Sequence, residues 1–67
     1  MTDLQISLAA ARVNAHMTQQ DVASAVGVSK STIISWENGK TYPNSIMLLK
    51  LSDLYKIPIG NIFLPSR

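Results

Sequence analysis

Residues 18–40 read TQQDVASAVGVSKSTIISWENGK, and this stretch decides the fold because it marks out two short helices. Thr18 and Ser29 are residues of the kind that cap a helix N-terminus through a side-chain oxygen. Gly27 stands between them, where a chain leaving a helix needs a positive φ that glycine adopts at no steric cost. A cap and short helix, a Gly turn, and a second cap and helix indicate a helix-turn-helix at about residues 18–37.

The second of these helices, expected at about residues 30–37, turns short or flexible hydrogen-bonding side chains outward. Such groups suit base edges in a major groove, whereas an ordinary solvated helix favours long Glu and Lys pairs. The expected base-reading residues are Lys30, Ser31, Thr32 and Ser35. Lys30 is suited to guanine O6 and N7, and Thr32 could contact a thymine methyl. The shortness of Ser31 and Ser35 leaves room for water-mediated or shape-based readout.

A longer string at fixed spacing resembles a known family. The string comprises Thr18-Gln19-Gln20-Asp21-Val22-Ala23, Val26-Gly27-Val28-Ser29, Ile33, Trp36-Glu37-Asn38-Gly39-Lys40 and Pro43. It resembles the DNA-binding domain of phage Cro and cI-type repressors, within the wider class of Xre-like transcriptional regulators. The likeness extends more loosely over about residues 4–64. It implies an all-α, five-helix lambda-repressor-like DNA-binding domain.

The resemblance also implies phosphate contacts by Gln19, Asn38 and Lys40. The residues add three further candidates for the same role, namely Gln20, Thr41 and Tyr42. Gln20 could instead support the base readers or bond a base itself. The alternative for residues 38–42 is a plain Asn-Gly turn with a solvated lysine.

Arg12 borders the buried face of the first helix, and a chain this small can bury its charge only if the charge is paired. In the family, an Arg at this place pairs with the Glu of the Trp-Glu-Asn-Gly turn, which is Glu37 here. The alternative for Arg12 is a phosphate contact. Trp36 is expected in the core rather than as a stacking platform.

Composition limits the classes open to the chain. Its 67 residues allow one domain, residues 1–67, and without Cys there is no disulfide or thiolate metal site. The lone His excludes a His-pair metal motif, and no run approaches 18 apolar residues. The N-terminus lacks the basic start of a signal peptide. We therefore expect a cytoplasmic, nucleoid-associated protein with no cofactor, no metal and no membrane contact.

The remaining helices are expected at about residues 3–14, 45–55 and 59–63. Asp3 lies close to the start of the first, and Ile6 and Val13 share its outer side, either as scattered surface residues or as a contact with another protein. No segment alternates with period two, so no strand is expected.

Three loop positions complete the reading of the chain. His16 stands where the family usually has Gly and is expected to take positive φ. Asn44 or Ser45 caps the helix at 45–55. Lys56 ends that helix where Gly is common.

Helix-turn-helix repressors bind DNA as two-fold dimers. The expected dimer patch is apolar surface at the C-terminal end, formed by Ile59, Phe63, Leu64 and Pro65. The alternative is that Phe63 and Leu64 fold back onto the domain.

These observations predict a sequence-specific, double-stranded DNA-binding transcriptional regulator, a Cro-like repressor on a palindromic operator. No small-molecule effector is expected, because an effector domain does not fit in 67 residues. The alternatives are an antitoxin or restriction-controller protein of the same fold, or a helix-turn-helix used for protein binding. An enzyme is not expected, because no acid–base pair, nucleophile–base pair or phosphate loop is present.

Overall fold

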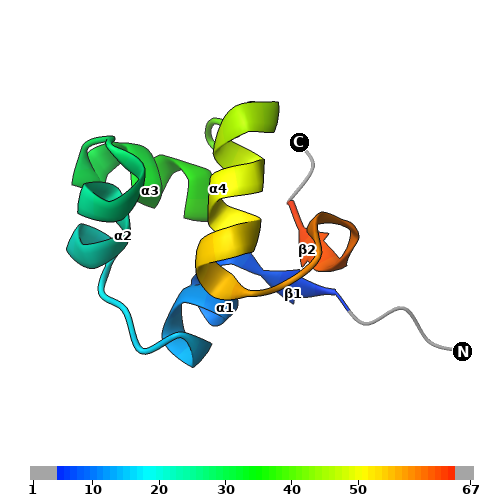
Figure 1. Ribbon diagram of the computed structural model, residues 1–67. Coiled ribbons are helices and arrows are strands. Elements are labelled where there is room, and N and C mark those ends of the chain that lie inside the picture. Colours follow the sequence, from blue (N-terminus) through cyan, green and yellow to red (C-terminus); the bar gives the residue numbers. More distant parts are fainter. Residues whose placement is uncertain (1–4, 65–67) are drawn as a thin grey trace, which may run out of the picture.

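The computed structural model describes residues 5–64 of the chain, apart from the Phe63 side chain. Its α-helices are α1 (Leu8–Asn14), α2 (Gln19–Val26), α3 (Lys30–Glu37) and α4 (Ser45–Tyr55). A short 3-10 helix, η1 (Ile59–Asn61), and two strands, β1 (Ile6–Ser7) and β2 (Ile62–Phe63), complete the fold. Figure 1 shows α2 and α3 on one side of α4, with the small sheet on its other side.

The chain is therefore mainly helical, but the prediction of five α-helices is wrong at both ends of the chain. The first helix starts later than expected, and the last expected helix does not form. The first helix begins at Leu8, and the Ser7 Oγ caps it by accepting from the Ala10 N–H at 3.1 Å. Asp3 and Leu4 lie outside the described residues. Instead of a helix at 59–63, the chain forms η1 and then β2.

The two strands pair in parallel, with Ile6 opposite Ile62 and Ser7 opposite Phe63. Ile6 is half-buried and packs against the core, so it does not share a helix face with Val13, which is 59% exposed. The β-branched residues Ile6 and Ile62 favour this extended conformation. Gly60 disfavours the helix that was expected at residues 59–63. A two-residue strand is too short to show a period of two, which is why the sequence pattern missed the sheet.

The expected helix caps are confirmed. In a capping box, the Thr18 Oγ1 accepts from the Asp21 N–H at 3.0 Å and the Asp21 Oδ2 accepts from the Thr18 N–H at 2.8 Å. The hydrogen bond that the Asp21 carboxylate accepts from the Thr18 N–H, followed by a contribution from the Thr18 side chain, lowers the pKa of Asp21. The Ser29 Oγ caps α3 by accepting from the Thr32 N–H at 3.3 Å. The Asn44 Oδ1 caps α4 by accepting from the Met47 N–H at 2.9 Å.

Positive φ occurs at the helix ends where the sequence predicted it. Gly27 has a φ of 81° after α2, and His16 and Lys56 each have a φ of 58° after α1 and α4. The two non-glycine residues do what glycine does at other helix ends, at some steric cost.

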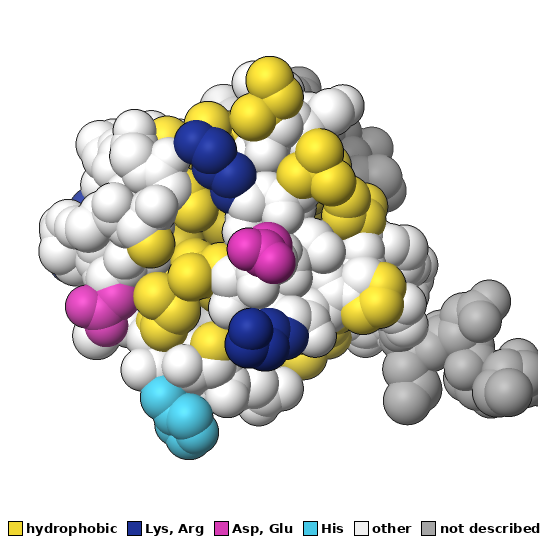
Figure 2. Space-filling model, in the orientation of Figure 1, with side chains coloured by type: hydrophobic (Ala, Val, Ile, Leu, Met, Phe, Trp, Pro, Cys, Tyr) yellow, Lys and Arg dark blue, Asp and Glu magenta, His cyan; other side chains and the backbone are white. Residues whose placement is uncertain are grey.

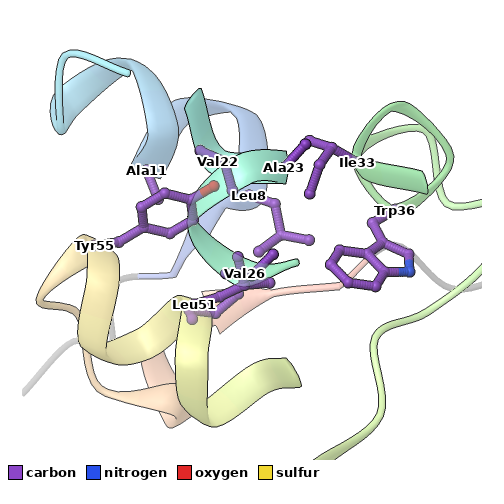
Figure 3. Close-up of a cluster of buried hydrophobic side chains, with 10 residues drawn as sticks. Leu8, Ala11, Val22, Ala23, Val26, Ile33, Trp36, Leu51 and Tyr55 are labelled. Atoms are coloured by element: carbon purple, nitrogen blue, oxygen red, sulfur yellow. The ribbon is translucent and has the colours of Figure 1, made fainter. Parts of the chain in front are cut away.

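One apolar cluster joins the four α-helices to β2 (Figure 3). Its members are Leu8, Ala11, Val22, Ala23, Val26, Ile33, Trp36, Leu51, Tyr55 and Ile62. Trp36 is 6% exposed, which confirms its expected place in the core. In the described part of the chain, no helix has the length and apolar character needed to cross a membrane.

Candidate nucleic-acid interface

α3 is held against α2 by buried apolar contacts and by the turn between the two helices. Val22 and Ala23 of α2 are fully buried, and Ile33 of α3 is 2% exposed. The Gly27 and Val28 N–H groups both donate to the Ala23 carbonyl, at 2.9 and 3.0 Å. This packing fixes which side of α3 faces outward.

The four expected base-reading residues remain accessible on α3. Lys30 and Ser31 are exposed, and Thr32 and Ser35 are half-buried. The buried positions of the helix are Ile33 and Trp36, and the polar side chains lie away from them together with the half-buried Ile34.

A cluster of hydroxyls at the start of α3 was not anticipated. The Ser29 Oγ lies 3.0 Å from the Ser31 Oγ and 3.0 Å from the Thr32 Oγ1. The signal was present in the sequence, because a capping serine followed by hydroxyls two and three residues later places all three together. Each hydroxyl is thereby oriented, and part of its hydrogen-bonding capacity is used within the protein.

The loop after α3 is tied back to the helix by backbone hydrogen bonds, two of them to the Ser35 carbonyl. The Ser35 carbonyl accepts from the Lys40 N–H at 3.0 Å and from the Thr41 N–H at 3.4 Å. Gly39, with a φ of 75°, lets the chain reverse direction. This loop gathers four exposed polar residues beyond the end of α3, namely Asn38, Lys40, Thr41 and Tyr42.

A second polar group of residues lies at the start of α2. A shallow groove there is lined by Arg12, Met17, Thr18, Gln19, Gln20 and Lys30. The groove brings Gln19 and Gln20 of α2 next to Lys30 of α3. Gln20 is exposed, and its Nε2 donates to the Ser24 Oγ at 3.3 Å.

Arg12 and Glu37 form an ion pair that links α1 to the end of α3. The Arg12 Nε donates to the Glu37 Oε2 at 2.8 Å, and the Arg12 Nη1 donates to the Met17 carbonyl at 3.1 Å. The side chains of Arg12 and Glu37 are 17% and 7% exposed. The hydrogen bond to Glu37 raises the pKa of Arg12, so the guanidinium stays charged over the ordinary pH range.

Gln19 joins this network, which sequence reasoning missed. Its Nε2 donates to the Glu37 Oε1 at 3.1 Å. The contact spans 18 positions and depends on how α2 and α3 pack, so local spacing carries no signal for it. One amide N–H of Gln19 points to Glu37, and the second can serve another acceptor.

The family follows from a sequence comparison that covers most of the chain. A sequence profile described as helix-turn-helix matches residues 8–62, which include all four α-helices. The chain belongs to this Xre-like helix-turn-helix family.

Similar proteins carry related names. An uncharacterized HTH-type transcriptional regulator, MJ0272 of Methanocaldococcus jannaschii, is 37% identical over 49 residues, covering 73% of this chain and 74% of that protein. The cryptic phage CTXphi transcriptional repressor RstR of Vibrio cholerae is 33% identical over 51 residues, covering 76% of this chain and 46% of that protein.

A third relative is of a different kind. The type II methyltransferase M1.ScrFI of Lactococcus lactis subsp. cremoris is 38% identical over 60 residues, covering 85% of this chain but only 15% of the methyltransferase. The chain thus spans from 15% to 74% of the length of these three relatives. No solved structure gave a significant match.

The dimer patch expected for a member of this helix-turn-helix family lies partly outside the described residues. Ile59 is 39% exposed, whereas Leu64 is half-buried and packs against the core. The Phe63 side chain and Pro65 are not described. Between residues 5 and 64, no three His, Cys, Asp or Glu side chains are grouped so that they could hold a metal ion.

Proposed function

We propose that this chain is a sequence-specific, double-stranded DNA-binding transcriptional regulator, a Cro-like repressor that reads the major groove with α3. One observation carries the proposal: α3 turns Lys30, Ser31, Thr32 and Ser35 outward while Ile33 and Trp36 anchor it in the core. A helix held in this way can enter a groove with its polar side chains directed at the bases.

We assign the phosphate contacts to two sets of polar residues, one on either side of α3. Gln19 and Gln20 lie at the start of α2, where backbone N–H groups and the helix dipole favour an anion. Asn38, Lys40, Thr41 and Tyr42 lie beyond the end of α3. Contacts on both sides would fix the register of α3 on the duplex, which base contacts alone do not do.

The hydroxyl cluster at Ser29, Ser31 and Thr32 bears on how bases are read. Because the three hydroxyls already satisfy one another in part, Lys30 is the side chain best able to give a direct, strong base contact. The shorter groups favour water-mediated contacts and sensitivity to DNA shape.

The operator is proposed to be a palindrome bound by a homodimer. Two copies of α3 would enter half-sites about 34–36 Å apart, or a multiple of this spacing. We place the protein in the cytoplasm of a bacterial or phage-infected cell, at the nucleoid, without a small-molecule effector and without enzymatic activity.

A second candidate is a restriction-controller protein of the same fold. The similarity of 60 residues to part of a type II methyltransferase favours it. Both candidates bind DNA through α3. They differ in the genes beside the operator, so mapping the selected site onto a source genome separates them.

Selection from random duplex DNA at moderate salt tests the proposed function. We expect an enriched palindrome for the unaltered protein, and a loss of about 1–3 kcal/mol of discrimination at one position for Lys30→Ala. Ser35→Ala should relax preference at a neighbouring position. Lys40→Ala, which removes the same charge at a proposed phosphate contact, is the matched control and should weaken binding while keeping the sequence preference. No enriched sequence, or equal relaxation by both lysine variants, would contradict the proposal.

A further inference from the structure

The outer face of α4 carries exposed apolar side chains together with charges. Ile46 and Leu49 are 64% and 60% exposed, while Leu51 and Tyr55 of the same helix are buried. Lys50 and Asp53 are exposed on the same side, because positions three and four apart share a helix face. Neither forms an ion pair with any residue that the structure describes. Figure 2 shows this face, with hydrophobic side chains and charges of both signs gathered over α4.

The C-terminal end of this face is hollowed. A groove there is lined by Leu49, Ser52, Asp53, Lys56, Ile57 and Pro58. The face therefore has a protruding apolar side chain, Ile46, at its start and a partly apolar groove at its end.

We propose that this face binds a second copy of the chain, with the two α4 helices antiparallel about a two-fold axis. In such a contact residue i meets residue j, and j meets i. An axis midway between Leu51 and Ser52 places Ile46 opposite the partner's Ile57, at the partner's groove. The same axis places Lys50 opposite the partner's Asp53. Symmetry repeats both contacts, so one face supplies two apolar insertions and two ion pairs.

The charges also disfavour neighbouring registers. Moving the axis toward the start of α4 brings Lys50 opposite the partner's Lys50. Moving it toward the end brings Asp53 opposite the partner's Asp53. Like charges across an interface act against the wrong arrangement, so Lys50 and Asp53 together select one register.

This inference names the partner surface of the dimer in the proposed function and rests on that function. It extends the interface from Ile59 onto α4. An 11-residue helix pair is smaller than the standard interface of about 1,200–2,000 Å², so we expect a weak dimer in solution. Two adjacent half-sites would strengthen it by holding two copies close together.

Complementary charge variants test the contact between chains. Lys50→Glu alone places two carboxylates opposite each other at each contact. Asp53→Lys alone places two ammonium groups opposite each other. Mixed in equal amounts, the two variants restore opposite charges at both contacts of a heterodimer. By sedimentation at low salt, we expect each variant alone to dimerise about tenfold more weakly than the unaltered protein, and the mixture to recover. Recovery cannot come from changes within one helix, because neither chain alone regains its pair.

Ile46→Ser tests the apolar insertion, and Val13→Ser is its matched control, since Val13 is 59% exposed on α1. Dimerisation should weaken for Ile46→Ser and stay unchanged for Val13→Ser. Circular dichroism checks that each variant is folded. A monomeric unaltered protein at every concentration, variants that dimerise normally, a mixture that fails to recover, or weakening by Val13→Ser instead would overturn the α4 interface. Sedimentation needs no DNA, so a dimer that selects no DNA sequence contradicts only the proposed function.

Discussion

At the scale of single residues, the Arg12–Glu37 pair shows what one largely buried charge requires of its neighbours. Glu37→Ala would leave the Arg12 guanidinium with the Met17 carbonyl as its remaining partner. We expect the free energy of unfolding, measured in urea, to fall by about 3 kcal/mol, because breaking a buried pair strands one charge. The double variant Arg12→Met/Glu37→Leu should lose less than Glu37→Ala, since no charge is stranded. A double variant that loses as much stability as Glu37→Ala would contradict this account.

Tyr55 makes stability depend on pH at the alkaline end. Burial, with a smaller contribution from the Glu37 charge, raises the pKa of Tyr55 to about 12. In the unfolded chain the pKa is about 10, so the contribution of Tyr55 is complete below about pH 10 and is lost as the pH rises toward 12. Urea unfolding should therefore show stability falling across this interval. Tyr55→Phe should fall less steeply, and equal slopes for the two proteins would argue against the assignment.

At the scale of elements, the helix ends at His16 and Lys56 hold side chains in a backbone conformation that favours glycine. His16→Gly should raise the free energy of unfolding by about 0.5–1 kcal/mol. The steric strain that the Cβ causes in the folded state is removed, and this gain exceeds the entropic cost of a more flexible glycine in the unfolded chain. His16→Ala keeps the Cβ and should give no gain. Thermal unfolding of the two variants makes the comparison, and equal midpoints would show that strain at this position is negligible.

The elements that could be predicted from the sequence are those set by local contacts. The caps at Thr18 and Ser29 reach backbone groups three residues away, so residue type and spacing suffice to find them. The outward face of α3 was predicted for the same reason. The sheet depends on Ile6 meeting Ile62, and the Gln19–Glu37 bond depends on helix packing; neither leaves a local pattern.

At the scale of the whole molecule, the net charge of +2 is small for a DNA-binding protein, so individual phosphate contacts should be measurable. DNA binding should weaken steeply with salt, because each neutralised phosphate releases counterions. Lys40→Ala should reduce the slope of log affinity against log salt by about one. Ser35→Ala should change sequence preference and leave the slope unchanged. A slope that is the same with and without Lys40 would remove that residue from the phosphate contacts.

The parallel pairing of β1 with β2 also bears on how the chain folds in time. It joins the first and last described elements and so closes the longest loop in this part of the chain, whereas α2 and α3 meet across a short turn. Closing long loops costs the most chain entropy, and we expect the sheet to form after the main folding barrier. Ile62→Val should then speed unfolding and leave the refolding rate nearly unchanged in stopped-flow experiments. The two strands would then pair last, after the helices have packed, and would hold the two ends of the described chain together.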